Sequence, residues 1–185
     1  MVIKINELKS KTIHLKLVAE NDAKFICDLR SNPELNKHIS QSSALVEEQQ
    51  AWIRKYKDRE RNNEEFYFII YRNDNNERIG TVRLYDFKTT PKSFCWGSWI
   101  LNQNKTRYAA IESALLIYKF AFDQLKFDQS HFDVRKENLG VHNFHIRLGA
   151  QHISSNNLDN FYVYPASSYY SILSDYKKFL CTRQK

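Results

Sequence analysis

Glycine and proline are scarce in this chain. There are 4 glycines and 3 prolines among 185 residues, whereas the two together make up about 12% of an average protein. This scarcity excludes a collagen-like chain, a low-complexity tract and a Gly/Ser linker. The chain is 42% hydrophobic and 14% aromatic, and its length corresponds to about one domain. We therefore expect one globular domain over residues 1–185 with a substantial core.

Cysteine is also rare, and long apolar runs are missing. The three cysteines, Cys27, Cys95 and Cys181, are odd in number and far apart, which argues against a disulfide framework and a zinc ribbon and fits a reducing compartment. Residues 1–18 contain no uninterrupted apolar segment of the kind that marks a secretory signal, and no stretch approaches the ~20 apolar residues that span a bilayer. We expect a cytoplasmic protein without a membrane span.

Acidic residues are outnumbered by basic ones. The chain has 28 Lys and Arg against 21 Asp and Glu, a net charge of +7. An excess of positive charge favours an anionic partner, which is a nucleic acid, a membrane surface or a phosphorylated small molecule. The plain alternative is a charged surface that keeps the protein soluble. Charge alone does not decide between these readings.

Apolar periodicity predicts alternating strands and helices. The clearest pattern is the apolar stripe over residues 111–125, which recurs at helical spacing. No internal repeat or linker interrupts the chain, so we expect one mixed α/β domain of the α+β kind, in the order β-α-α-β-β-β-α-β-α-β-β. The predicted strands are 12–18, 66–71, 78–85, 94–101, 130–134, 151–153 and 160–164, and the predicted helices are 22–30, 46–62, 107–126, 138–148 and 169–180.

The loop between the fourth predicted strand and the longest helix is a candidate anion site. It contains Lys105 and Arg107 and runs directly into the helix. A helix N-terminus offers unpaired backbone N–H groups and the positive end of the helix dipole, so this loop can bind phosphate. The alternative is an ordinary loop with two solvated cations, since no glycine pattern is present.

Four segments of the chain are informative in combination with the order of elements: 14–22, 46–53, 78–84 and 138–150. Together they resemble the GNAT superfamily of acyl-CoA-dependent N-acyltransferases. The resemblance extends roughly from Thr12 to Ile153 and is greatest to the branch that includes ribosomal-protein acetyltransferases and the acyltransferases of nucleotide-linked amino sugars. It implies acyl-CoA as cosubstrate and a mostly antiparallel mixed sheet, flanked by helices and splayed between its fourth and fifth strands.

The resemblance also implies where coenzyme A binds. In this family the loop ahead of the long helix holds the pyrophosphate, usually with two glycines, and Tyr108 and Ala110 stand at their places here. A bulky Tyr108 disfavours positive φ, so we expect the loop to take another path or to bind the pyrophosphate less tightly.

The resemblance further implies that the fourth strand pairs with the pantetheine arm through its backbone and polarises the thioester carbonyl. The implied coenzyme-binding residues are Trp99, Ile100, Leu101, Asn104, Lys105, Thr106, Arg107, Tyr108, Ala109, Ala110 and Asn138.

His145 is the candidate catalytic side chain. It falls beside the apolar stripe of the helix that begins at Asn138, at a place where the resemblance implies a Tyr that protonates the departing thiolate. An imidazole with the ordinary pKa of ~6.5 can donate a proton to a thiolate whose conjugate acid is near ~8.5. The alternative is a structural histidine on a helix flank.

The amine acceptor must also lose a proton. Candidates near the expected gap are Asp86, His131 and Asp133, and none stands out. In the resembling family, a water chain or binding of the neutral amine can replace a dedicated base. Tyr85 and Trp96, with His131, are expected to line the acceptor side, where rings stack on a sugar or a base. Their alternative role is in the core.

These observations predict an enzyme that moves an acetyl or short acyl group, such as 3-hydroxybutyryl, from acyl-CoA to an amine. The attack is direct and needs no metal. The resemblance favours the amino group of a dTDP- or UDP-linked amino deoxysugar, which suits a basic protein. The runner-up is a protein N-terminal acetyltransferase with an open peptide groove. An alternative of another class is a non-catalytic, basic nucleic-acid-binding module. Whether the chain forms a homodimer is left open.

Overall fold

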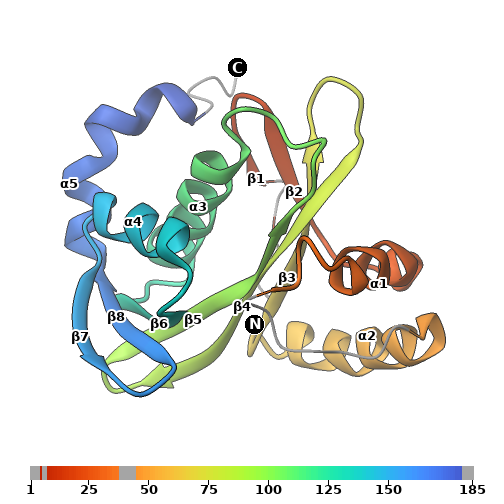
Figure 1. Ribbon diagram of the computed structural model, residues 1–185, viewed down its shortest axis with the longest axis horizontal. Helices are drawn as coiled ribbons and strands as arrows, with labels where there is room; N and C mark the ends of the chain where they lie inside the picture. Colours follow the sequence, from red (N-terminus) through yellow and green to blue (C-terminus); the bar gives the residue numbers. More distant parts are fainter. Residues whose placement is uncertain (1–4, 6–7, 38–44, 181–185) are drawn as a thin grey trace.

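One twisted sheet runs through the molecule, with helices on both sides (Figure 1). The computed structural model describes residue 5 and residues 8–37 and 45–180. Within these described residues the sheet has eight strands in the order β1-β2-β3-β4-β5-β6-β8-β7. Neighbouring strands are antiparallel except for β5 and β6, which are parallel. The predicted mixed α/β fold is therefore confirmed.

The elements follow the predicted order. Asn138 caps α4 by accepting a hydrogen bond from the backbone N–H of Val141 at 3.3 Å, and Gly149 follows that helix with a φ of 98°; both are typical of helix ends. The strands are β1 (Leu8–Lys9), β2 (Ile13–Leu17), β3 (Phe66–Arg72), β4 (Arg78–Thr89), β5 (Lys92–Leu101), β6 (Gln129–Arg135), β7 (Gln151–Ser155) and β8 (Asp159–Pro165), and the α-helices are α1 (Ala23–Ser31), α2 (Val46–Arg61), α3 (Ala109–Lys119), α4 (Leu139–Arg147) and α5 (Ala166–Tyr176).

The boundaries differ from the predictions in a few places. The short strand β1 was not predicted, and β4 and β5 extend the hairpin as far as Thr89 and Lys92. The predicted helix 107–126 begins only at Ala109 and passes into a π-helical turn, Phe120–Gln124, in which the first three residues are all buried. Helix α5 begins directly after Pro165 rather than at residue 169. Cys27 and Cys95 are free and buried, whereas Cys181 lies outside the described residues.

Alternation along β3 divides the core into two parts. Phe66, Phe68 and Ile70 pack on the side of α3, whereas Tyr67 and Ile69 pack on the side of α1 and α2, because successive side chains of a strand point to opposite faces. Both parts are fully buried at these positions. The sheet is thus covered by α1 and α2 on one face and by α3, α4 and α5 on the other (Figure 1). Among the described residues, no helix is long and apolar enough to cross a membrane.

The sheet splits between β5 and β6. These strands pair only at Ser93 with Gln129 and at Phe94 with Ser130, and the Ser130 hydroxyl donates to the Phe94 carbonyl at 3.1 Å. Beyond this junction, the described residues of β5 pair with β4 and those of β6 pair with β8. The splay predicted between the fourth and fifth strands is confirmed.

Gly80 lets β4 and β5 approach each other next to this split. A Cβ atom at Gly80 would lie 2.1 Å from the backbone oxygen of Ile100, and neither strand can give way without breaking the ladder between them. We expect Gly80→Ala to lower the free energy of unfolding by about 3 kcal/mol, measured by urea denaturation. Gly140→Ala is the control, because a Cβ there meets nothing within 4 Å, and we expect it to add about 0.5–1 kcal/mol to the stability of α4. Equal stability of the two variants would contradict this reading.

Candidate active site

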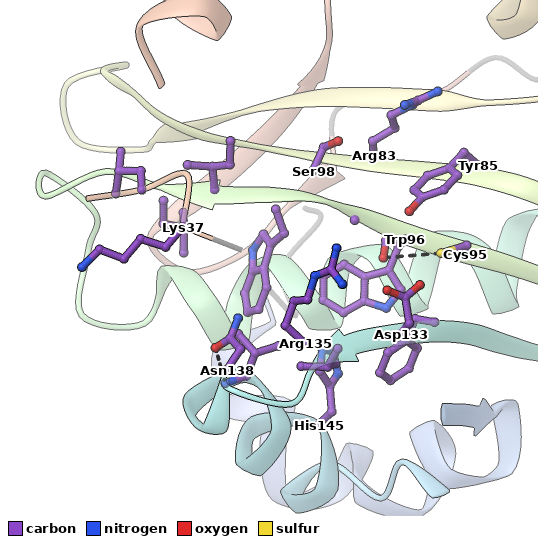
Figure 2. A pocket seen from close by; sticks show the side chains of 18 of the residues that line it. Lys37, Arg83, Tyr85, Cys95, Trp96, Ser98, Asp133, Arg135, Asn138 and His145 are labelled. Carbon is purple, nitrogen blue, oxygen red and sulfur yellow. Dashed lines mark hydrogen bonds between the residues drawn. The ribbon is translucent and has the colours of Figure 1, made fainter. Parts of the chain in front are cut away.

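A cavity of about 640 Å³ fills the gap between β5 and β6. Figure 2 shows that β4 and β5 form one wall, β6 a second, and α4 the end, where Asn138 and His145 lie. Glu34, Leu35 and Lys37, which follow α1, also line the cavity. The cavity therefore lies against the one parallel junction of the sheet.

A β-bulge shapes the β5 wall. Gly97 pairs with Arg83 and Ile100 with Thr81, so the two residues between them face a single residue of β4. One of these two, Ser98, has a φ of 46°, and its carbonyl accepts a hydrogen bond from Thr81 Oγ1 at 2.8 Å. Positive φ in a residue other than glycine carries a strain of order 1 kcal/mol and recurs at ligand-binding sites. Gly97 stands at the start of this bulge, where a glycine is common in a strand.

The split leaves the cavity side of this bulge without a neighbouring strand. Within the described chain, β5 has no strand partner on that side beyond Phe94. Trp99, Ile100 and Leu101 all line the cavity. An extended ligand could therefore hydrogen-bond to this edge as a further strand would.

His145 is buried at the closed end of the cavity. Only 4% of the residue is exposed, and its ring lies 4.3 Å from that of Phe132 and 5.3 Å from that of Trp96, measured between centroids. Its Nδ1 atom is buried with no hydrogen-bond partner among the described residues. The prediction that His145 faces the gap is therefore correct in its geometry.

The assumption of an ordinary pKa for His145 was wrong. Burial, and to a lesser extent the neighbouring His142, lower the pKa of the His145 imidazole to about 3, because burial penalises the charged form. Near neutral pH the ring is therefore uncharged and does not begin the reaction as an imidazolium acid.

The two tryptophans belong to the walls of the site. Trp96 Nε1 donates to the Tyr118 hydroxyl at 3.2 Å, and Trp99 Nε1 donates to Ser113 Oγ at 3.0 Å. Both acceptors are on α3, so these bonds fix the indoles against that helix. Trp96 lines the cavity but is only 5% exposed. Trp96 therefore forms part of the cavity wall and exposes little of its ring to an acceptor.

Tyr85 reaches the cavity across β5. A Cβ atom at Gly97 would lie 3.0 Å from the Tyr85 hydroxyl, so the missing side chain leaves room for this ring. Burial raises the pKa of Tyr85, and the phenol is neutral at physiological pH. Tyr85 therefore lines the cavity, and its contact with the acceptor stays a prediction.

The three base candidates separate in space. Asp133 lines the cavity from β6, and desolvation together with the Asp159 carboxylate raises the pKa of Asp133. Asp86 and His131 are not among the residues described as lining it. His131 bridges Ser93 Oγ and Asp86 Oδ2, with both distances 2.9 Å, and its bond lowers the pKa of Asp86. Asp86 and His131 are thus partners of each other beside the junction of β5 and β6, and their catalytic or acceptor-binding role stays a prediction.

The loop before α3 takes a path that needs no glycine. Tyr108 has a φ of −107°, and no described residue from Leu101 to Ala110 has a positive φ. Thr12 Oγ1 and Thr106 Oγ1 are 2.6 Å apart, and the buried Glu112 carboxylate accepts from the Thr12 backbone N–H at 2.9 Å. These bonds hold the loop against β2.

Only part of the expected coenzyme-binding set reaches the cavity. Trp99, Ile100, Leu101 and Asn138 line it. The loop residues lie outside its described lining, next to the start of α3, where unpaired helix N–H groups can receive an anion. These residues are Asn104, Lys105, Thr106, Arg107, Tyr108, Ala109 and Ala110.

Several charged residues in the cavity were not predicted from the sequence. Arg83, Arg135 and Lys37 line it together with Glu34. A detectable signal existed only for Arg83, a charged residue inside a strand whose neighbours are apolar or aromatic. Its position in the cavity depends on the register of β4 against β5, which the sequence pattern does not supply.

Comparison with known proteins agrees with this geometry. Residues 12–151 match the sequence family described as "Acetyltransferase (GNAT) domain". A curated relative, the probable N-acetyltransferase YjcK of Bacillus subtilis (strain 168), is 27% identical over 139 residues, which is 72% of this chain and 77% of that protein. The chain therefore belongs to the GNAT acetyltransferase family.

Several solved structures are also similar to this chain. The structure of apo FdhC, a nucleotide-linked sugar GNAT, is 55% identical to this chain, with a TM-score of 0.89, and the match covers 95% of this chain and 99% of that one. The ribosomal-protein-S5-alanine acetyltransferase from Vibrio fischeri shares the fold at 13% identity, with a TM-score of 0.77 and coverage of 89% and 99%. The GNAT domain implies an acyl-CoA cosubstrate, and an open strand edge beside a cavity fits an extended pantetheine arm.

The burial of neutral His145 predicts a loss of stability in acid. The unfolded chain binds a proton at this imidazole below about pH 6.5, whereas the folded chain does so only near pH 3. The free energy of unfolding should thus fall as the pH drops through this window, and His145→Phe should remove about 2 kcal/mol of the loss between about pH 7.5 and about pH 5. Urea denaturation at both pH values measures the difference. His152→Phe, which removes an exposed ring, should keep the wild-type dependence; the same acid loss in His145→Phe would contradict the assignment.

Proposed function

We propose that this protein transfers an acetyl or short acyl group, such as 3-hydroxybutyryl, from acyl-CoA to the amino group of a dTDP- or UDP-linked amino deoxysugar. The observation that carries the proposal is the 55% identity to a nucleotide-linked sugar GNAT across nearly the whole chain. The cavity supports it, because Lys37, Arg83 and Arg135 outnumber Glu34 and Asp133 among the charged residues described as lining it. An excess of cations favours an anionic acceptor.

The thioester would lie along the open edge of β5. Backbone N–H groups near Trp99, Ile100 and Leu101 would donate to the thioester carbonyl oxygen and stabilise the negative charge that develops there. The strained bulge at Ser98 fixes this part of the strand before the substrate arrives. The amine nitrogen attacks the carbonyl carbon, the carbon–sulfur bond breaks, and an amide and a CoA thiolate are formed.

His145 would carry the proton in this reaction. The nitrogen loses one proton when it forms the amide, and the departing sulfur needs one. A neutral imidazole accepts the first, and the thiolate that develops beside it stabilises the imidazolium until the proton passes to sulfur. The low pKa of the ring in the free protein, about 3, makes this order the chemically reasonable one.

Asp133 would assist by attracting the amine. Its carboxylate lines the cavity from β6, whereas the carboxylate of Asp86, the other acidic candidate, is not among the residues described as lining it. A partly desolvated carboxylate binds a cationic amine more strongly than an exposed one does. The bound ammonium would give one proton to the Asp133 carboxylate, whose pKa is raised, and attack as the neutral amine. The second proton, released from the nitrogen as the amide forms, would pass through His145 to sulfur.

The acceptor class is tested by a panel of amines. We expect transfer from acetyl-CoA or 3-hydroxybutyryl-CoA to dTDP- or UDP-linked amino deoxysugars, and no transfer to peptides with ribosomal-protein N-termini. Product formation measured by mass spectrometry checks this. Acylation of the peptides alone would favour the protein N-terminal acetyltransferase instead. A thermal shift produced by duplex DNA but by no CoA thioester would favour the nucleic-acid-binding module.

His145 is tested by turnover and coenzyme affinity together. We expect His145→Phe and His145→Gln to lower kcat by about 100-fold, because neither side chain can carry the proton. The Kd for acetyl-CoA should change little, because the thioester is held by backbone groups of β5. Steady-state kinetics and calorimetry supply the two numbers, with His152→Phe as the control. Unchanged kcat in both His145 variants would remove this residue from the mechanism.

A further inference from the structure

A second cavity opens beside the active site on the other face of the sheet. It has a volume of about 230 Å³ and lies under α1 and α2. Arg83 and Ser98 line both cavities, so the two spaces meet at the bulge of β5. The described residues that line the second cavity are Ile26, Arg30, Gln49, Trp52, Tyr67, Arg83 and Ser98.

Arg83 is held rigidly at this meeting point. Its Nε donates to Glu65, a carboxylate only 5% exposed that also accepts from Arg59 Nε at 2.8 Å. Its guanidinium carbon lies 5.0 Å from the centre of the Trp52 ring and 4.9 Å from that of Tyr85. A guanidinium fixed in this way loses little entropy when it binds a ligand.

The orientation of Arg83 leaves its outer nitrogens for an anion. The bond to Glu65 uses Nε, and the two terminal NH₂ groups make no hydrogen bond within the described part of the chain. Figure 2 shows the side chain extending from β4 away from His145, toward the face that carries α1 and α2. The fork of an arginine matches the oxygens of a phosphate group.

The other residues that line the second cavity also favour an anion. Arg30 supplies a second cation, and Gln49 and Ser98 supply neutral polar groups. No carboxylate is among the described lining residues. Two arginines and neutral polar groups in one lining suit a group that carries two negative charges close together, which is the charge of a diphosphate ester.

We propose that this second cavity is the subsite for the diphosphate of the acceptor, with Arg83 and Arg30 as its ligands. This inference rests on the proposed transfer to a nucleotide-linked sugar and adds where the nucleotide is held. The sugar would then lie across Ser98, between the diphosphate and the thioester on β5. The pyrophosphate of coenzyme A is expected elsewhere, beside the start of α3 on the opposite face of the sheet.

Calorimetry with the full-length protein tests the subsite. We expect dTDP or UDP to bind the wild type, and thymidine and uridine, which lack phosphate, to bind much more weakly. Arg83→Gln and Arg30→Gln should each weaken nucleoside diphosphate binding by about tenfold or more. The affinity of Arg83→Lys for the nucleoside diphosphate should lie between those of the wild type and Arg83→Gln, because lysine keeps the charge and lacks the forked guanidinium. Arg61→Gln is the control, since Arg61 is exposed at the end of α2 and pairs with Asp58.

A second readout separates misfolding from loss of the subsite. Each variant should bind acetyl-CoA with a Kd close to that of the wild type, because the thioester arm is expected along the backbone of β5 and not against the side chains of Arg83, Arg30 or Gln49. Gln49→Leu tests the same cavity without disturbing Glu65, and we expect it to weaken binding of the nucleoside diphosphate as well.

The outcomes distinguish this inference from the proposed function. Failure of both dTDP and UDP to bind the wild type, or wild-type affinity for them in Arg83→Gln and Arg30→Gln, would overturn the subsite. Arginine-dependent binding without acyl transfer to any nucleotide-linked amino sugar would keep the subsite and reject the acceptor. Transfer to such a sugar with a KM that the two arginine variants leave unchanged would keep the acceptor and reject the subsite.

Discussion

The short parallel contact between β5 and β6 is the constraint on which the rest of the structure depends. Two residue pairs make it, Ser93 with Gln129 and Phe94 with Ser130, and His131 reinforces it through Ser93 and Asp86. Beyond it, the two strands follow different partners and a cavity fills the space between them. A strand edge left open inside a protein is unfavourable unless a ligand or water pairs with it. The fold thus maintains a place for an extended ligand.

The chemistry of the site follows from what closes this gap. Helix α4 places His145 among aromatic rings at the closed end, so that the imidazole is neutral and able to accept a proton. On the opposite face, the bulge at Ser98 and the side chain of Arg83 connect the site with a second, cationic cavity. A neutral imidazole at one end and cations at the other are the two features that support the proposed acceptor, an amine linked to a diphosphate.

The sequence predicts much of the fold and less of the site. Periods of 2 and 3.6 residues identify the principal strands and helices, because burial of one face imposes them, and they also place His145 beside the gap. They cannot reveal how completely a ring is buried, so the lowered pKa of His145 was not predicted. Nor do they give cross-strand neighbours: Asp86 and His131 looked like separate candidates and proved to be partners. The role of Arg83 depends on the register around a bulge, which is a tertiary property.

Hydrogen–deuterium exchange across β5, with and without saturating acetyl-CoA, tests the central claim most directly. If the thioester arm pairs with the open edge, amides from Gly97 to Leu101 should exchange more slowly in the complex, whereas those of β3 should exchange at the same rate in both samples. Coenzyme binding that leaves exchange from Gly97 to Leu101 unchanged would contradict the account, because the gap between β5 and β6 would then serve some other purpose.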